Sequence, residues 1–161
     1  MSDIVVVGID PGVTGATVVL DGDRNVLATY RPKESWYLCG DEYRPDAMLA
    51  TLGVIEHKHK PALWVLEKQW ARPADGPHQA FLTGYGYGLW FMALAALSLP
   101  SVDIAPQRWQ AVITKGSPGA GPKARAKHVC EVLLPNLGGD HNVRDAACIA
   151  LYGLTVVGVE L

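Results

Sequence analysis

The chain opens with three apolar runs rich in β-branched residues, which cover 4–9, 14–20 and 25–31. The first run is unbroken and ends on Asp10, and a Pro11-Gly12 turn leads into the second run. Short apolar runs bounded by such turns are typical of strands, and turns this tight join antiparallel neighbours. We therefore predict a meander of three antiparallel strands at the start of the chain.

Helical stripes and short apolar runs alternate after an aperiodic stretch over 32–45, which we interpret as a loop. Helices are predicted over 46–60, 78–98, 106–113 and 123–134 and from residue 140 onward, and strands over 62–66 and 102–104. Asp46 is expected to cap the first of these helices. The order predicts an α/β fold with a mixed five-stranded sheet, three antiparallel strands and then parallel ones, flanked by helices on both faces.

Glycines mark two of the predicted segments. The helix over 78–98 contains Gly84, Gly86 and Gly88. Each costs roughly 1 kcal/mol relative to alanine in a helix, so we expect these glycines to serve close packing against a neighbouring element. The stretch over 115–122 is also rich in glycine and is predicted to be a mobile loop.

Composition limits the class of protein. With 161 residues, 49% of them apolar and 19% charged, the sequence fits one compact domain over 1–161. The longest apolar stretch, 89–97, is too short to span a bilayer, and the start of the chain lacks the pattern of a signal peptide. The three cysteines show no metal-ligand spacing, and their odd number argues against a disulfide framework. We expect a reducing, cytoplasmic setting and no membrane partner.

The formal net charge of −2 does not indicate a nucleic-acid-binding protein, but the distribution of charge does. No acidic residue lies between Asp103 and Glu131, and the basic residues of that segment are Arg108, Lys115, Lys123, Arg125 and Lys127. The segment therefore predicts a local basic patch. The alternative is a solvated charged face that acids from elsewhere in the chain balance in space.

Two carboxylates stand at the ends of predicted buried strands. Asp10 ends the first apolar run, and Glu67 follows the run over 62–66. Burial of a carboxylate is costly unless positive charge meets it, so Asp10 predicts a metal ion, a phosphate-bound cation or a helix N-terminus nearby. The simpler alternative is that Asp10 only caps the turn that follows it.

A third acidic residue lies on the last predicted helix. At about 100° per residue, His141 and Asn142 lie within roughly 60° of Asp145, whereas Asp140 falls on the far side unless it precedes the helix. Carboxylates with oxygen-rich neighbours and no cysteine suit Mg²⁺ or Mn²⁺ rather than Zn²⁺. Two such ions can activate a water and stabilise the leaving oxygen of a phosphodiester.

These residues carry a resemblance to a known family. The motif Gly8-Ile9-Asp10-Pro11-Gly12-Val13-Thr14-Gly15 is followed by Glu67 and then by Asp145-Ala146-Ala147-Cys148-Ile149-Ala150. In this order the chain resembles RuvC-type Holliday-junction resolvases of the ribonuclease H-like superfamily, in a bacteriophage-like branch. Further matching positions, in order, are Ala105-Pro106, Val112, Lys123, His128 and Leu133-Leu134. The resemblance covers residues 4 to 153 and implies a ribonuclease H-like fold and a metal-dependent endonuclease that resolves junctions in DNA by paired nicks.

The resemblance also implies roles for individual residues. Asp10, Glu67 and Asp145 would hold Mg²⁺, for which Mn²⁺ substitutes, and no small-molecule cofactor is expected. Lys123 would contact the scissile phosphate, and Trp70 would stack on a base at the strand-exchange point. The helix over 78–98 would form a homodimer whose two-fold symmetry matches a four-way junction. Further DNA contacts are expected from Lys68, Arg72, Arg108, Lys115, Arg125 and Lys127.

One position departs from the family's pattern. Many members have an acid or a histidine three residues before the last aspartate, whereas this chain has Asn142 there, preceded by His141 and Asp140. Asn142 offers a carbonyl oxygen as a metal ligand, and His141 can ligate a metal or position the attacking water. The fourth ligand therefore stays open among these three residues.

Simpler interpretations exist for three of the matching side chains. Lys123 can be a solvated residue at a helix start, although its acid-free segment favours a phosphate contact. Trp70 can be a core residue, although its polar neighbours favour an exposed loop. His128 lies between apolar positions and is interpreted as a packing residue.

Other functions compete with the junction resolvase. Sugar kinases of the actin-like superfamily have a similar first turn, but they duplicate the domain and this chain holds one copy. A non-catalytic nucleic-acid-binding module of the same fold is a second alternative, which retention of all three acids argues against. A nuclease specific for flaps or forks, or one that processes RNA, is the third, because a fold does not fix the substrate.

Overall fold

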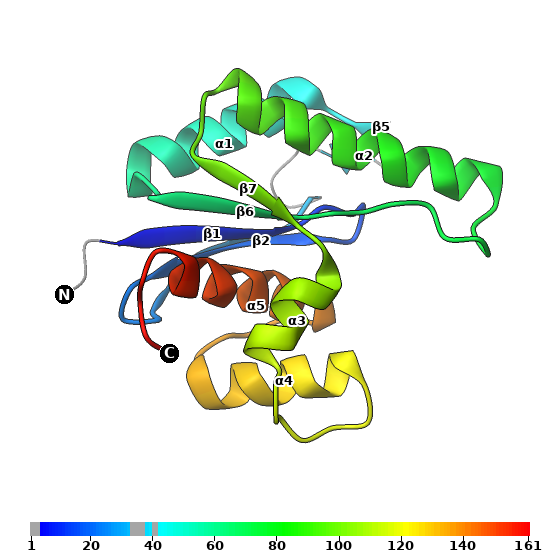
Figure 1. The fold of residues 1–161 in the computed structure, drawn as a ribbon. Coiled ribbons are helices and arrows are strands. Elements are labelled where there is room, and N and C mark those ends of the chain that lie inside the picture. The colour runs from blue at the N-terminus through cyan, green and yellow to red at the C-terminus, as the bar shows by residue number, and fades with distance from the viewer. Residues whose placement is uncertain (1–3, 33–37, 40–41) are drawn as a thin grey trace.

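A five-stranded sheet forms the centre of the computed structural model, which describes residues 4–32, 38–39 and 42–161 (Figure 1). Its strands are β1 (Val5–Asp10), β2 (Ala16–Asp21), β3 (Val26–Tyr30), β6 (Leu63–Glu67) and β7 (Ser101–Ile104). They lie in the order β3-β2-β1-β6-β7, with β2 antiparallel to β1 and β3, and β6 parallel to β1 and β7. The predicted meander and the predicted mixed sheet are both confirmed.

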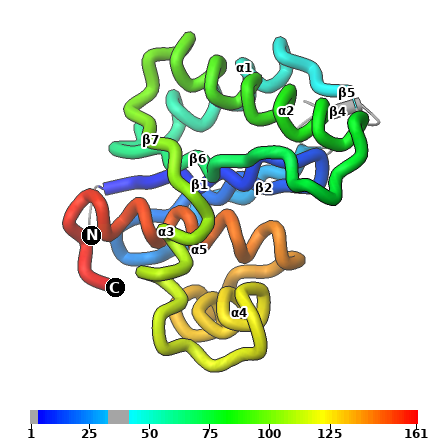
Figure 2. The backbone as a smooth tube through the Cα atoms, turned by 45° about the vertical axis from the view of Figure 1, so that its right-hand side comes forward, coloured from blue at the N-terminus to red at the C-terminus, as the bar shows by residue number. Residues whose placement is uncertain are grey.

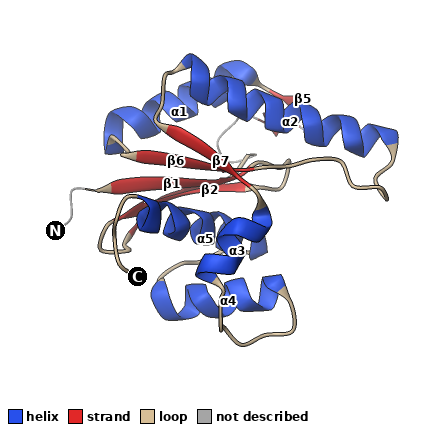
Figure 3. Cartoon of the chain, in the orientation of Figure 1, coloured by secondary structure: helices blue, strands red, loops and turns tan. Residues whose placement is uncertain are grey.

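Helices cover both faces of the sheet (Figures 1 and 3). One face carries α1 (Pro45–His59) and α2 (Pro77–Ala96), and the other carries α5 (His141–Val156). Two further helices, α3 (Pro106–Ile113) and α4 (Pro122–Leu133), pack against α5. Figure 2 shows α4 on the far side of α5 from the sheet, so this half of the molecule is one layer deeper. In the described part of the chain, no helix combines the length and apolarity needed to cross a membrane.

Alternation along the central strands divides the apolar side chains between two cores. Val6 and Val65 belong to the core beneath α5, whereas Val7, Trp64 and Leu66 belong to the core beneath α1 and α2. Successive side chains of a strand point to opposite faces, so a sheet covered on both sides requires apolar residues at every position. This requirement explains the unbroken apolar runs in β1 and β6.

Gly8 allows α5 to lie unusually close to the sheet. An added Cβ at Gly8 would overlap the carbonyl oxygen of Ala146 and the backbone nitrogen of Ala150. The small residues on that side of α5 are fully buried. The glycine in β1 and the alanines in α5 therefore set the distance between strand and helix.

The stretch over 32–45 was interpreted as a loop, and the structure corrects part of it. Leu38–Cys39 (β4) pairs antiparallel with Glu42–Tyr43 (β5) in a separate two-stranded sheet. Residues 33–37 and 40–41 lie outside the described residues.

The prediction that Asp46 caps α1 is wrong, because the helix begins at Pro45 and Arg44 holds the cap position. Asp46 instead lies in the first turn and pairs with Arg44 at 3.1 Å.

The glycine predictions are confirmed only in part. Gly86 packs closely on Tyr43, whose ring carbon Cε2 would lie 2.9 Å from an added Cβ. At Gly84 and Gly88, no atom of the described residues would lie within 4 Å of an added Cβ. Between α3 and α4 the chain forms the predicted loop, where Gly119 adopts a φ of 136°. The mobility of that loop stays a prediction.

Candidate active site

Three carboxylates meet at one edge of the sheet. Asp10 ends β1 and Glu67 ends β6, and these strands are parallel with Gly8 opposite Val65 and Ile9 opposite Leu66. The carboxyl ends of parallel neighbours lie at the same edge, so the two acids are adjacent. Asp145 joins them from the beginning of α5, which packs on β1. The structure therefore brings together the three acids that the sequence singled out.

Burial is the largest influence on the pKa of each of these acids. Burial, together with the charges of Glu67 and Asp145, raises the pKa of Asp10 to about 8, although Arg31 opposes the rise. Burial also raises the pKa of Glu67 and the pKa of Asp145. Negative charge at this edge is thus poorly compensated by the chain itself, and an added cation would be favoured.

Two neutral donors hold oxygens of these carboxylates. The Gln69 amide donates to Asp10 Oδ1 at 3.3 Å, and the Trp109 indole donates to Glu67 Oε1 at 2.8 Å. The sequence analysis assigned no role to Gln69 or to Trp109. Gln69 lies only two residues beyond Glu67, so its closeness to the acids could have been predicted from the sequence. Nothing in the sequence linked Trp109 to Glu67, which is 42 positions away.

Asp140 has hydrogen-bond partners outside the carboxylate cluster, although its charge helps to raise the pKa of Asp10 and of Asp145. Its side chain caps α5 by accepting from the backbone N–H groups of Asn142 and Val143 at 3.0 and 3.2 Å. It also forms a bidentate ion pair with Arg31, at 2.6 and 2.9 Å. The hydrogen bonds from Arg31 lower the pKa of Asp140 to about 2. Among the three candidates for a fourth ligand, Asp140 therefore already has other partners, and the sequence analysis missed Arg31.

Positive charge approaches Asp145 from two sides. His141 is exposed in the first turn of α5, and Lys123 is exposed in the first turn of α4. Both oppose the rise in the pKa of Asp145 that burial causes. Asn142 is half-buried beside them in the first turn of α5. Lys123 and His141 thus lie within electrostatic range of one of the three acids, and their predicted roles toward the phosphate, the metal and the water stay predictions.

The oxygen ligands at this edge suit a hard divalent cation, but their side chains are not arranged around a single ion. Carboxylate oxygens and an amide carbonyl are ligands that Mg²⁺ and Mn²⁺ prefer. Asp10 is buried with a raised pKa, and a cation is the partner that would compensate its charge. As the side chains stand, no three potential ligands from His, Cys, Asp or Glu within residues 4–32, 38–39 and 42–161 enclose a single ion.

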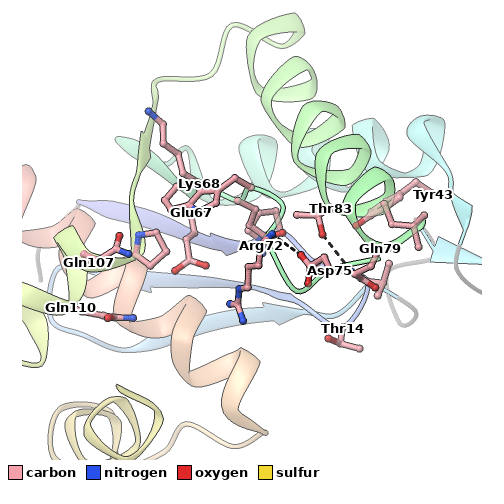
Figure 4. A pocket seen from close by; sticks show the side chains of 17 residues that line it. Thr14, Tyr43, Glu67, Lys68, Arg72, Asp75, Gln79, Thr83, Gln107 and Gln110 are labelled. Carbon is pink, nitrogen blue, oxygen red and sulfur yellow. Dashed lines mark hydrogen bonds between the residues drawn. The ribbon is translucent and has the colours of Figure 1, made fainter. Parts of the chain in front are cut away.

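A cleft of about 550 Å³ leads away from Glu67 between the β1–β2 turn, the segment after β6 and the start of α2 (Figure 4). Its polar and aromatic lining includes Thr14, Tyr43, Lys68, Trp70, Arg72, Gln79, Gln107 and Gln110. Trp70 is 53% exposed, so the core alternative for this residue is wrong. The Arg72 side chain approaches Glu67 and lowers its pKa, against the larger effect of burial.

The basic residues predicted to contact DNA differ in their availability. Arg108 and Lys115 are exposed on α3 and just after it, whereas Arg125 is half-buried and its Nε has no hydrogen-bond partner among the described residues. Lys127 pairs with Glu131 at 3.6 Å within α4. Lys68 is held by Asp103 at 3.0 Å, and Asp103 also accepts from the Tyr87 hydroxyl. DNA contact by these residues stays a prediction.

Comparisons with known proteins bear on the fold. No protein-family model matches the sequence, and no curated protein matches it significantly. Among solved structures, Thermus thermophilus RuvC is 20% identical with a TM-score of 0.70, over 97% of this chain and 98% of that one. The same organism's RuvC in complex with Holliday junction substrate is 18% identical with a TM-score of 0.69, over 97% of both chains. The yeast mitochondrial Holliday junction resolvase Ydc2 is 15% identical with a TM-score of 0.55, over 95% of this chain and 78% of that one. The fold expected from the resemblance is therefore confirmed.

Proposed function

We propose that this chain is a divalent-metal-dependent endonuclease that cleaves branched DNA and resolves Holliday junctions by paired nicks as a homodimer. The observation that carries the proposal is the meeting of Asp10, Glu67 and Asp145 at one sheet edge of this fold. Similar solved structures bear the names of Holliday junction resolvases, and one of them is a complex with junction DNA.

The proposed chemistry follows from the side chains at that edge. Asp10, Glu67 and Asp145 would hold Mg²⁺, or Mn²⁺ in its place, and Asn142 would offer an additional oxygen ligand. Bound there, the ions would make a water more acidic and stabilise the charge that develops on the phosphodiester. Lys123 would place its ammonium group against the scissile phosphate, and His141 would orient or accept a proton from the attacking water.

The cleft beside Glu67 supports contact with a distorted region of DNA. Trp70 exposes an indole at the cleft, where it can stack on an unpaired base irrespective of sequence. Arg72 supplies positive charge at the same place. Arg108 on α3, Lys115 just after it, and Arg125 and Lys127 on α4 supply further basic residues. A branch point would then lie at the cleft with its arms across the basic residues.

Pairing of two copies through α2 supports the symmetric form of the reaction. An apolar stripe at helical spacing is exposed on this helix, with Phe81 at 66%, Tyr85 at 39% and Met92 at 61%. Gly84 and Gly88 lie between them, and in the described part of the chain nothing would contact a Cβ added at either position. Large exposed apolar surfaces mark interaction sites, and glycines allow two backbones to approach closely. A two-fold dimer would carry two acidic centres, one for each nick.

Incubation with labelled four-way junction, fork, flap and linear duplex DNA tests the proposal. We expect Mg²⁺-dependent paired nicks in the junction, little cleavage of duplex and none in the presence of chelator. Asp10→Asn should abolish cleavage and retain junction binding, because amide and carboxylate have the same shape but only the carboxylate compensates a cation. Preference for flaps, forks or RNA would correct the substrate, and binding without cleavage under all these conditions would indicate a non-catalytic module.

A further inference from the structure

Trp109 makes a hydrogen bond to a proposed metal ligand, although it has no role in the proposed function described above. Its indole Nε1 donates to Glu67 Oε1 at 2.8 Å, across the junction between α3 and the end of β6. Among the described residues, Trp109 is the hydrogen-bond donor to the Glu67 carboxylate. One of the two oxygens of a proposed metal ligand is therefore already occupied by a neutral donor.

The position of the Trp109 ring is fixed by its surroundings. The side chain is 1% exposed and belongs to the core that α3, α4 and α5 form with the sheet. α3 begins at Pro106, two residues after the end of β7, so the helix that carries the ring is anchored to the sheet edge next to β6. A donor held this firmly fixes the orientation of the carboxylate it binds.

Trp64 gives an internal comparison. It is 0% exposed on β6, yet its indole nitrogen has no hydrogen-bond partner among the described residues. A buried indole in this fold is thus tolerated without an acceptor, although a partner is usually found. Burial alone therefore does not explain why the Trp109 N–H is directed at Glu67.

We propose that Trp109 is a positioning residue that holds Oε1 of Glu67, so that the carboxylate presents its other oxygen to a divalent cation. This inference rests on the proposed metal-dependent function. A neutral indole suits the task because it orients the carboxylate without adding a positive charge that would compete with the cation, as an arginine or lysine would. Loss of such a supporting hydrogen bond typically lowers metal affinity by about 10- to 100-fold.

The first test is the variant Trp109→Phe, which keeps a large aromatic ring and removes the donor. Mn²⁺ affinity, measured by electron paramagnetic resonance of the free ion, should fall roughly tenfold or more. Trp64→Phe is the matched control, because it removes a buried indole N–H that has no partner, and it should leave Mn²⁺ affinity unchanged. Equal affinities of Trp109→Phe and the wild type would overturn the proposal.

A double substitution separates positioning from general damage to the core. In a Glu67→Ala background, Trp109→Phe should have no further effect on Mn²⁺ affinity, because the side-chain oxygens on which Trp109 acts are gone. An equal loss in both backgrounds would mean that Trp109 acts through the core and not through Glu67.

A measurement on the unaltered protein covers the case in which Trp109→Phe does not fold. In ¹⁵N-labelled wild type, the indole N–H resonance of Trp109 should shift as Mg²⁺ is added, and that of Trp64 should not. An unchanged Trp109 resonance at saturating Mg²⁺, or absence of any Mg²⁺ binding, would overturn the inference. Metal binding with the predicted shift but no cleavage of any DNA would instead contradict only the proposed nuclease function.

Discussion

Asp10 combines burial with the proximity of two other carboxylates, and both conditions favour its protonated form. Its pKa of about 8 in the folded chain lies above the ordinary value of 3.8. Between these two values the folded state keeps a proton that the unfolded state has lost. The stabilising contribution of this proton is therefore complete below about pH 4 and is lost as the pH rises through about 8.

The metal-free protein should accordingly lose thermal stability between pH 5 and pH 8.5, and Asp10→Asn should lose less. The asparagine variant cannot ionise, so its melting temperature should depend less steeply on pH. Melting followed by circular dichroism in the presence of chelator measures both slopes. Asp140 does not interfere in this range, because its pKa of about 2 keeps it ionised throughout. Parallel slopes for the two proteins would contradict the interpretation, whereas Mg²⁺ should reduce the slope of the wild type.

Lys123→Ala should lower the cleavage rate far more than it weakens DNA binding. One phosphate contact is a small part of the total electrostatic affinity, but this ammonium lies beside Asp145, where charge would develop during the reaction. We expect a loss of roughly 100-fold in single-turnover rate. Lys127→Ala, one turn along the same helix, is the comparison, because a proposed DNA contact with no role in the chemistry should weaken junction binding but change the single-turnover rate little. Similar losses in rate and in junction affinity for Lys123→Ala would make it a binding residue only.

Among individual residues, the acids could be predicted from the sequence, but two of the residues that hydrogen-bond to acidic side chains at the site could not. Asp10 and Glu67 follow apolar runs that can be recognised locally, so their position at strand ends could be predicted. Arg31 and Trp109 act on residues 109 and 42 positions away, and only the folded chain brings these partners together. Their side chains also have ordinary roles, as a surface cation and a core aromatic, which local sequence cannot distinguish from the roles seen here.

The beginning of α5 is the element whose placement matters most for the site. Asp140 caps the helix and also ties it to Arg31 at the end of β3, so one side chain stabilises the helix and anchors it to the sheet. Asp145 lies just beyond the first turn of this helix. The geometry of the third acid therefore depends on an interaction made five residues earlier.

Substitutions at Asp140 should separate the cap from the ion pair. Asp140→Asn keeps an oxygen for the helix cap and loses the ion pair, whose partners are both partly exposed, so it should cost less than about 1 kcal/mol. Asp140→Ala loses both interactions and should cost about 1 kcal/mol more. Urea denaturation of these variants and of Arg31→Met measures the difference. Equal stability of Asp140→Asn and Asp140→Ala would show that the cap contributes little.

Whole helices and strands were predicted correctly where the residues that begin or end them leave few alternatives. Pro106 starts α3 at the predicted residue, and the apolar runs of β1 and β6 leave few alternatives. The start of α1 was mispredicted because Asp46 is a common capping residue, whereas Pro45, which cannot donate a backbone hydrogen bond, takes the first helical position. The pairing of β4 with β5 was missed because two-residue strands carry no periodicity.

The proposed dimer would depend on the exposed apolar stripe of α2. Phe81→Glu combined with Met92→Glu places charges in the exposed stripe of α2 and should convert a dimer to a monomer, because a charge in an apolar interface loses its hydration without gaining a partner. Light scattering at micromolar concentration measures the change. Val132→Glu, at a similarly exposed apolar residue on α4, should leave the dimer intact. The double variant should also produce single nicks in place of paired ones. A monomeric wild type, both free and on junction DNA, would contradict paired incision by this chain.

The close contact of β1 with α5 has a consequence for how the protein tolerates mutation. Gly8, Ala146 and Ala150 are buried between the sheet and α5, and any larger side chain at Gly8 must push α5 outward. That displacement would carry Asp145 away from Asp10, so a substitution that adds a single methyl group should impair both folding and catalysis. In a scan of all single substitutions selected for nuclease activity, these small residues should rank with the acids themselves among the least replaceable positions. Residues of the exposed α4 face, such as Val132, should accept most changes.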